Sequence, residues 1–205
     1  MAYAHGSNPE RAALPLAELK IVVAGGFGVG KTTLVTTLSE RPPLLTEEVL
    51  TDTGRSVDDL TGVATKTTTT VAMDFGRITF PDPPQPMILF LFGTPGQERF
   101  WFAWSDLSYG AVGAVVLADT RRLEDSFAAV SYFEQRKTPF VVAVNHFDGS
   151  HHYTPAEVRC ALEVGPDVPV LTCDVRQHAS AMTVVIHLVE HSLHHHRRLT
   201  SGARP

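Results

Sequence analysis

The feature that most constrains this chain is a glycine-rich turn between an apolar run and a helical stretch. The turn, GGFGVGKT at residues 25–32, matches the pattern GxxxxGK[ST], and residues 19–25 are typical of a short buried strand. Glycines let the backbone bend so that consecutive N–H groups point at phosphate oxygens, and the helix that begins near Lys31 adds its positive end. The sequence therefore predicts a phosphate-binding loop (P-loop).

This loop supplies the first set of predicted site residues. Lys31 is expected to reach the β- and γ-phosphates of a nucleotide, and Thr32 is expected to offer its hydroxyl to Mg²⁺. The predicted nucleotide-binding residues of the loop are Gly25, Gly28, Val29, Gly30, Lys31, Thr32 and Thr33.

The rest of the chain alternates between strand-like and helix-like stretches. Residues 71–80 have strand-like alternation, and residues 87–92, 111–118, 140–144 and 168–171 are continuous apolar runs, as in central strands covered on both faces. With about five helices, including 31–40, 121–136 and 155–163, these strands predict a three-layer α/β P-loop NTPase fold with a six-stranded, mostly parallel sheet. Residues 41–69 are polar and proline-interrupted, which indicates mostly loop.

Length and composition limit the other possibilities. The 205 residues predict one domain at 17–197 between flexible tails at 1–16 and 198–205, and the apolar share of 43% is enough for a full core. A net charge of −5 argues against nucleic-acid binding, and two cysteines are too few for a disulfide framework or a zinc cluster. With no signal peptide and no membrane-spanning run, we expect a cytoplasmic protein without direct membrane insertion.

A second motif predicts contacts with the base of the nucleotide. Asn145 and Asp148 form an NxxD sequence directly after the apolar run at 140–144. The Asp148 carboxylate can accept two hydrogen bonds from N1 and N2 of guanine, a donor pair that adenine lacks. The motif therefore predicts GTP and GDP as ligands, and it disfavours the weaker alternative of an ATPase-type protein.

A third segment, Gly93-Thr-Pro-Gly96-Gln97, follows the run at 87–92. With it the chain resembles the Ras superfamily of small GTPases. More narrowly it resembles the bacterial Mgl-type GTPases, and most closely the actinobacterial conservon GTPases, in the segments VVAGGFGVGKTT, TKTTTTVAMDFGRI, LFGTPGQ and ADTRRLEDSFAAV. The resemblance implies a Ras-like fold and a GTP-hydrolysing molecular switch with Mg²⁺. It also implies a roadblock-domain protein and a sensor-kinase-like membrane protein as partners, one of which could recruit the chain to the membrane.

The same resemblance assigns further roles. Gln97 and Lys31 would be catalytic, with Gln97 orienting the attacking water. Thr70 would join Thr32 at the metal, and the Gly96 amide would sense the γ-phosphate. The remaining base contacts implied are His146, in place of the usual lysine, and the backbone of Cys173 and Asp174.

Two departures keep a second function open. Gly93 stands where the resemblance places a metal-linked aspartate, so Mg²⁺ binding should be weakened or use a substitute. No arginine finger can be assigned, so slow intrinsic hydrolysis is expected. The alternative is a nucleotide-locked scaffold that binds guanine nucleotide with little or no hydrolysis.

Four aromatic residues close together leave two interpretations open. Phe100, Trp101, Phe102 and Trp104 follow Gln97 directly. They form either half-buried core or a partner-binding surface that is exposed in one nucleotide state.

Overall fold

A seven-stranded sheet in the order β2-β3-β4-β1-β5-β6-β7 forms the middle layer of the structure, a computed structural model that describes residues 16–42, 44–51, 68–81, 86–96 and 102–201. The strands are β1 Ala17–Ala24, β2 Leu44–Thr51, β3 Thr68–Phe80, β4 Met87–Gly93, β5 Gly113–Ala118, β6 Phe140–Asn145 and β7 Val170–Cys173. The helices are α1 Lys31–Leu38, α2 Phe102–Ser108, η2 Leu123–Ser126, α3 Phe127–Gln135, α4 Pro155–Ala161 and α5 His178–Ser201. The predicted α/β class with a mostly parallel sheet is confirmed.

The parallel strands bring several of the predicted site residues to one edge of the sheet. β4, β1, β5, β6 and β7 run parallel to one another, so their carboxyl ends lie together. Ligands of open α/β sheets bind at that edge. The P-loop, Gly93, Asn145 and Cys173 each stand at the carboxyl end of one of these strands.

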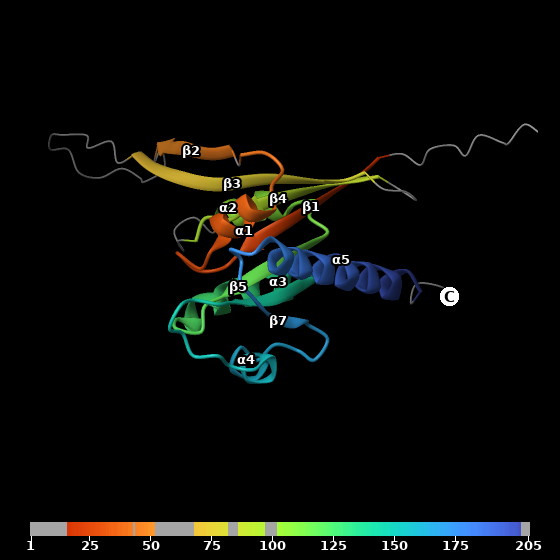
Figure 1. Cartoon of the computed structure of the whole chain (residues 1–205). Helices are drawn as coiled ribbons and strands as arrows, with labels where there is room; N and C mark the ends of the chain where they lie inside the picture. Colours follow the sequence, from red (N-terminus) through yellow and green to blue (C-terminus); the bar gives the residue numbers. More distant parts are fainter. Residues whose placement is uncertain (1–15, 43, 52–67, 82–85, 97–101, 202–205) are drawn as a thin grey trace, which may run out of the picture.

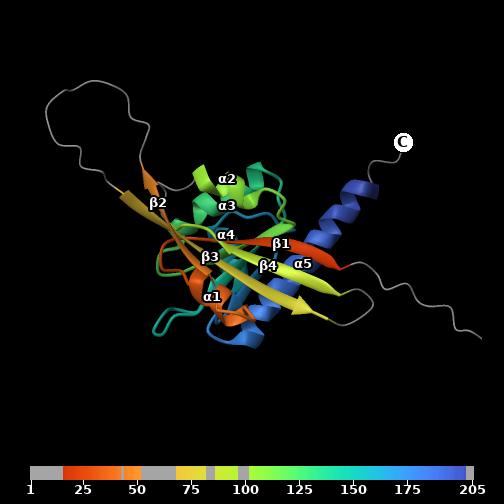
Figure 2. The ribbon, with the colours of Figure 1, turned by 90° about the horizontal axis from the view of Figure 1, so that it is seen from above.

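Alternate residues of each central strand pack into two cores. Ile21 and Val23 of β1 face the layer of α1 and α5, whereas Val22 and Ala24 face α2, α3 and α4. All four side chains are fully buried. This burial on both faces explains why the central strands are continuous apolar runs. In Figure 2, α2 and α3 lie on one side of the strands and α1 and α5 lie on the other.

The segment interpreted as mostly loop contains a strand that the sequence analysis did not predict. β2 pairs antiparallel with β3 from Leu44 opposite Phe75 to Thr51 opposite Thr68. β3 in turn pairs antiparallel with β4. The hairpin places β2 and β3 at one edge of the sheet, far from α4 at the other (Figure 1).

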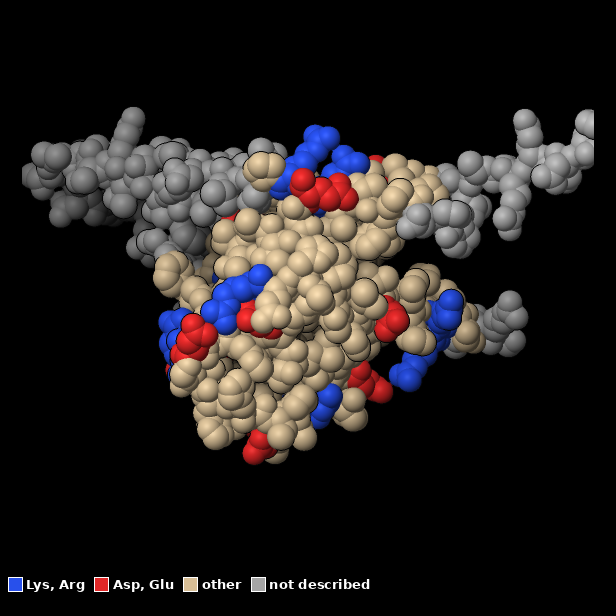
Figure 3. Space-filling view, in the orientation of Figure 1, with Lys and Arg blue, Asp and Glu red and all other residues tan. Residues whose placement is uncertain are grey.

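The remaining features concern the surface and the last helix. α5 continues to Ser201, past the boundary expected at residue 197. None of the helices in the described ranges is both long enough and apolar enough to cross a membrane. On the face in Figure 3, the described lysine and arginine side chains are scattered among acidic and uncharged ones.

Candidate functional site: a phosphate loop and a base-binding edge

The P-loop lies between β1 and α1 in a conformation that requires glycine. Gly30 has a φ of 106° and precedes the first helical residue, Lys31. A Cβ atom at Gly30 would lie 2.8 Å from Asn145 Nδ2, so no other residue fits there without a shift. No side chain caps this end of α1. The N–H groups of its first turn, which include those of Thr32 and Thr33, therefore lack an intrahelical partner and can bind an anion.

Lys31 is held inside the loop. Its side chain is buried, and its Nζ donates hydrogen bonds to Gly25 O (2.9 Å) and Gly26 O (2.7 Å). Burial lowers the pKa of Lys31 to about 8, an effect that the nearby charge of Asp74 partly opposes. A Cβ atom at Gly96 would lie 2.6 Å from Nζ, so Gly96 packs directly on the ammonium group. The structure thus brings Lys31 and Gly96 together, and their contacts with phosphate stay predictions.

Thr32 contacts a carboxylate that sequence reasoning did not assign to the site. The Thr32 hydroxyl donates a 2.7 Å hydrogen bond to Asp74 Oδ2. Asp74 lies on β3, directly opposite Gly93 of β4, and is only 7% exposed. The two residues are 42 positions apart, so only the strand register reveals the contact.

Asn145 connects the P-loop to the segment after β7. Its Nδ2 donates to Val29 O (3.0 Å), and its Oδ1 accepts from the backbone N–H of Val175 (3.2 Å). The side chain is 4% exposed. Both ends of the amide are therefore engaged within the protein, and Asn145 fixes the relative position of two site loops. Val29 takes part through its carbonyl oxygen.

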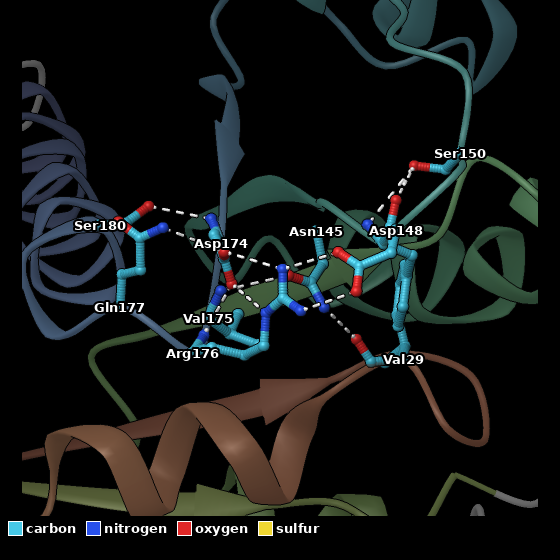
Figure 4. A network of polar contacts seen from close by, with 10 residues as sticks. Val29, Asn145, Asp148, Ser150, Asp174, Val175, Arg176, Gln177 and Ser180 are labelled. Atoms are coloured by element: carbon cyan, nitrogen blue, oxygen red, sulfur yellow. Dashed lines mark hydrogen bonds and ion pairs between the residues drawn. The ribbon is translucent and has the colours of Figure 1, made fainter.

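Asp148 stands beyond Asn145 and faces an arginine (Figure 4). Arg176 NH2 and NH1 lie 3.2 and 3.4 Å from the two carboxylate oxygens of Asp148. The same guanidinium bonds Asp174 through Nε at 2.9 Å and NH2 at 3.0 Å, which lowers the pKa of Asp174 to about 2. The Asp148 side chain is 89% exposed, so a ligand can reach it. Arg176 is a second site residue that sequence reasoning missed.

The other predicted base contacts have partners within the protein. The backbone N–H of Asp174 donates to Ser180 Oγ at 3.0 Å, and the N–H of His146 donates to Cys173 O at 2.8 Å. Cys173 is buried, which raises the pKa of its thiol to about 12. The ring centres of His146 and His152 lie 4.6 Å apart. Stacking of His146 on a base and backbone contacts from Cys173 and Asp174 stay predictions.

Two neighbouring arginines make further contacts, and one of them bonds to the P-loop. Arg121 forms an ion pair with the buried Asp119 at 2.7 Å and lies over the ring of Phe147. Arg122 NH2 donates to Phe27 O of the P-loop at 2.9 Å. Their sequence, two arginines at the expected start of a helix, gave no signal for these contacts.

Two further predicted site residues are Thr70 and Gln97. Thr70 lies within β3, opposite Val49 of β2, and is separated from Asp74 by about 13 Å at the rise of an extended strand. Residues 68–73 form a strand rather than a loop, and a role of Thr70 at the metal stays a prediction. Gln97 lies outside the described residues.

Of the aromatic residues that follow Gln97, the structure shows Trp104 in the core. Trp104 is 3% exposed, packs against Tyr132 and Phe133, and its Nε1 donates to Pro95 O at 3.2 Å. It belongs to the core beneath the site rather than to an exposed surface. Phe100 and Trp101 lie outside the described residues.

Comparison with known proteins gives two matches. Residues 23–195, most of the chain, match the model of a family described as "conserved hypothetical ATP binding protein". An uncharacterized protein of Methanocaldococcus jannaschii is 30% identical over 133 residues, which cover 64% of this chain and 71% of that protein.

These matches correct the resemblance drawn from the sequence. The family whose model covers residues 23–195 is a different P-loop family, so identification with the Ras superfamily and its Mgl-type and conservon members was wrong. Of the segments that carried the resemblance, the phosphate loop is common to P-loop proteins of many families and does not distinguish one family from another. The roadblock-domain and sensor-kinase-like partners, which depended on it alone, stay untested predictions.

Proposed function

The chain belongs to the family of conserved hypothetical ATP binding proteins, and we propose that it binds GTP and GDP with Mg²⁺ and hydrolyses GTP slowly. The observation that carries the proposal is the position of Lys31. Its buried ammonium group lies in the P-loop at the uncapped end of α1, on the edge of the sheet that also carries Asp148. Phosphates and base would occupy the two ends of this edge.

The phosphate end would act through charge. Lys31 uses two of its three N–H donors on the carbonyls of Gly25 and Gly26, and it can turn toward a phosphate that offers charged acceptors instead. The free N–H groups of the first turn of α1 add further donors and a positive dipole. Both features would bind a di- or triphosphate in its fully ionised form.

Thr32 is the residue that would hold Mg²⁺ together with the nucleotide. Its side chain is exposed at the start of α1, and its hydroxyl offers an oxygen, the atom type that Mg²⁺ prefers. The described residues contain no group of three or more His, Cys, Asp and Glu side chains that could hold a metal. This fits Mg²⁺, which is usually bound by one or two side chains plus the phosphates of the substrate. When bound, the ion would neutralise charge on the β- and γ-phosphate oxygens.

The base end would favour guanine. Arg176 presents two N–H donors to the two carboxylate oxygens of Asp148, and guanine presents the same kind of pair from N1 and N2. Adenine has no such pair and would leave the carboxylate unpaired. The description of the family names ATP, so ATP is the second candidate ligand for this site.

Hydrolysis would follow from the same groups. The oxygen of a water molecule attacks the γ-phosphorus, the bond from that phosphorus to the bridging oxygen breaks, and GDP, phosphate and a proton are released. Lys31 and the amides of α1 would neutralise the charge that develops. We propose Gln97 as the residue that orients the water. Among the described arginines, Arg122 comes close to the P-loop, but its guanidinium bonds the backbone carbonyl of Phe27. An arginine engaged in this way fits a slow reaction.

The test is an equilibrium titration with fluorescent derivatives of GDP and ADP in the presence of Mg²⁺. We expect tighter binding of GDP, and a loss of about 10- to 100-fold in Lys31→Ala, which removes charge-assisted hydrogen bonds. Lys20→Ala is the matched control, because Lys20 lies in β1 and bonds Tyr109 O away from the loop. Equal binding by Lys31→Ala and wild type would overturn the proposal.

A further inference from the structure

Gly93 has no side chain at the end of β4, and a side chain from the neighbouring strand fills the space. In P-loop NTPases the P-loop Ser or Thr shares Mg²⁺ with an aspartate at the end of a strand. The P-loop of this chain follows β1, whose parallel partner β4 ends at Gly93, which has no side chain. A Cβ atom built at Gly93 would lie 2.9 Å from Asp74 Oδ2 and 3.0 Å from Asp74 Cβ. The Asp74 side chain therefore occupies the space that a residue at 93 would use.

The pairing of β3 with β4 explains how Asp74 reaches this place. Asp74 is directly opposite Gly93 in the antiparallel ladder. Gly76, two residues further along β3, faces Val35 of α1, so the alternation of the strand points Asp74 to the same side. That side carries the P-loop and Thr32.

The surroundings of Asp74 leave its charge without a cation in direct contact. The carboxylate is more than nine-tenths buried, and Thr32 Oγ1 is its hydrogen-bond donor at 2.7 Å. Within the described part of the chain, the ion pairs of Lys, Arg and His side chains are made with other carboxylates. The charge of Lys31 is near enough to interact with Asp74, but the two form no ion pair, so the buried carboxylate is only partly compensated. A bound divalent cation would remove the remaining cost.

We propose that Asp74 is the carboxylate that holds Mg²⁺ beside Thr32, in place of the side chain that Gly93 lacks. This inference rests on the proposed nucleotide binding. The Thr32 hydroxyl has one hydrogen and two lone pairs, and donation of the hydrogen to Asp74 leaves the lone pairs for the ion. Asp74 would act on Mg²⁺ directly or through a bound water, as carboxylates at Mg²⁺ sites do.

The experiment measures how fast a bound fluorescent GDP dissociates in Mg²⁺ and in excess chelator. For wild type we expect Mg²⁺ to slow dissociation, so that the chelator accelerates it. Asp74→Asn keeps the size and the acceptor for Thr32 but removes the charge. We expect this variant to lose about 10-fold or more of its Mg²⁺ affinity, so that dissociation in Mg²⁺ approaches the rate in chelator. Asp106→Asn, an exposed position of α2, is the matched control and should behave as wild type.

The two conditions separate the inference from the function on which it rests. Binding of GDP by wild type in Mg²⁺ reports the nucleotide site as a whole, and its absence would contradict the proposed function. A chelator effect in Asp74→Asn as large as in wild type would overturn the role of Asp74 alone. Titration of the GDP complexes with Mn²⁺, followed by electron paramagnetic resonance, should show the same loss of metal affinity.

A second variant keeps the test decisive if Asp74→Asn fails to fold. Gly93→Ala places a methyl group against the Asp74 carboxylate without changing any charge. We expect it to displace the carboxylate and to weaken the effect of Mg²⁺ on dissociation. Unchanged Mg²⁺ dependence in folded Gly93→Ala would count against the inference.

Discussion

The guanidinium of Arg176 holds both carboxylate oxygens of Asp148 through its two terminal nitrogens, at 3.2 and 3.4 Å. The two side chains are exposed, at 54% and 89%, and they lie at the edge where the proposed base site forms (Figure 4). A guanine base that uses the same oxygens has to displace Arg176. Arg176 and a guanine base therefore compete for the same carboxylate.

Removal of this competitor should strengthen the binding of guanine nucleotides. An exposed ion pair is weak because water screens it, so we expect Arg176→Ala to raise the affinity for GDP only modestly, by about 1.5- to 5-fold. Calorimetric titration with GDP checks this, with Arg197→Ala on the exposed end of α5 as the control. A weaker affinity in Arg176→Ala would mean that Arg176 contacts the nucleotide rather than competes with it.

Asp148 should decide the base preference. Asp148→Asn replaces one acceptor oxygen by an NH₂ donor. This donor would face an N–H donor of guanine, and two donors cannot form a hydrogen bond. We expect the affinity for GDP to fall by about 10- to 100-fold and the affinity for xanthosine diphosphate, which has a carbonyl at that position, to rise. Competition between the two nucleotides measures the change. Unaltered preference would place the base elsewhere.

Nucleotide affinity should depend on pH through Lys31. In the free protein burial lowers the pKa of this lysine to about 8, and bound phosphate favours the protonated form and raises it again. Affinity is therefore fully present below pH 8 and falls as the pH rises through 8, by up to about tenfold per unit. Lys31→Arg, which stays charged, should show a flatter profile over pH 7 to about 9.5. Parallel profiles for the two proteins would assign the dependence to another group, such as the nucleotide itself.

Trp104 should matter for stability. Its ring is 3% exposed between Tyr132, Phe133 and the carbonyl of Pro95. We expect Trp104→Ala to lower the free energy of unfolding by about 3–5 kcal/mol in urea titrations. Tyr109→Ala, at an 85% exposed position nearby, should change it by no more than about 0.5 kcal/mol. A small effect of Trp104→Ala would contradict the core position of this residue and favour a role in a partner-binding surface.

The sequence predicted those parts of the molecule that local pattern determines. The GKT motif, the apolar runs of β1, β4, β5 and β6, and the position of Asn145 at a strand end are local signals, and each element lies where the pattern indicated. β2 was missed because residues 44–51 lack a clear alternation and follow two prolines. A strand at the edge of a sheet is specified by its partner as much as by its own sequence.

The missed site residues share one cause. Asp74 contacts Thr32, and Arg176 contacts Asp148, across 42 and 28 positions of the chain. Such pairs depend on strand register and loop path, which no single-sequence motif encodes. Gly93 did give a signal, because its missing side chain raised the question of a substitute, and the answer required the register of β3 against β4.

The most direct test of the account is multiple-turnover phosphate release by the purified protein in Mg²⁺, with GTP and with ATP at equal concentrations. We expect slow release from GTP, less from ATP, and none above background in Lys31→Ala. Equal or faster release from ATP would contradict the guanine preference. Tightly bound GTP without any release would contradict hydrolysis and identify the chain as a nucleotide-locked scaffold.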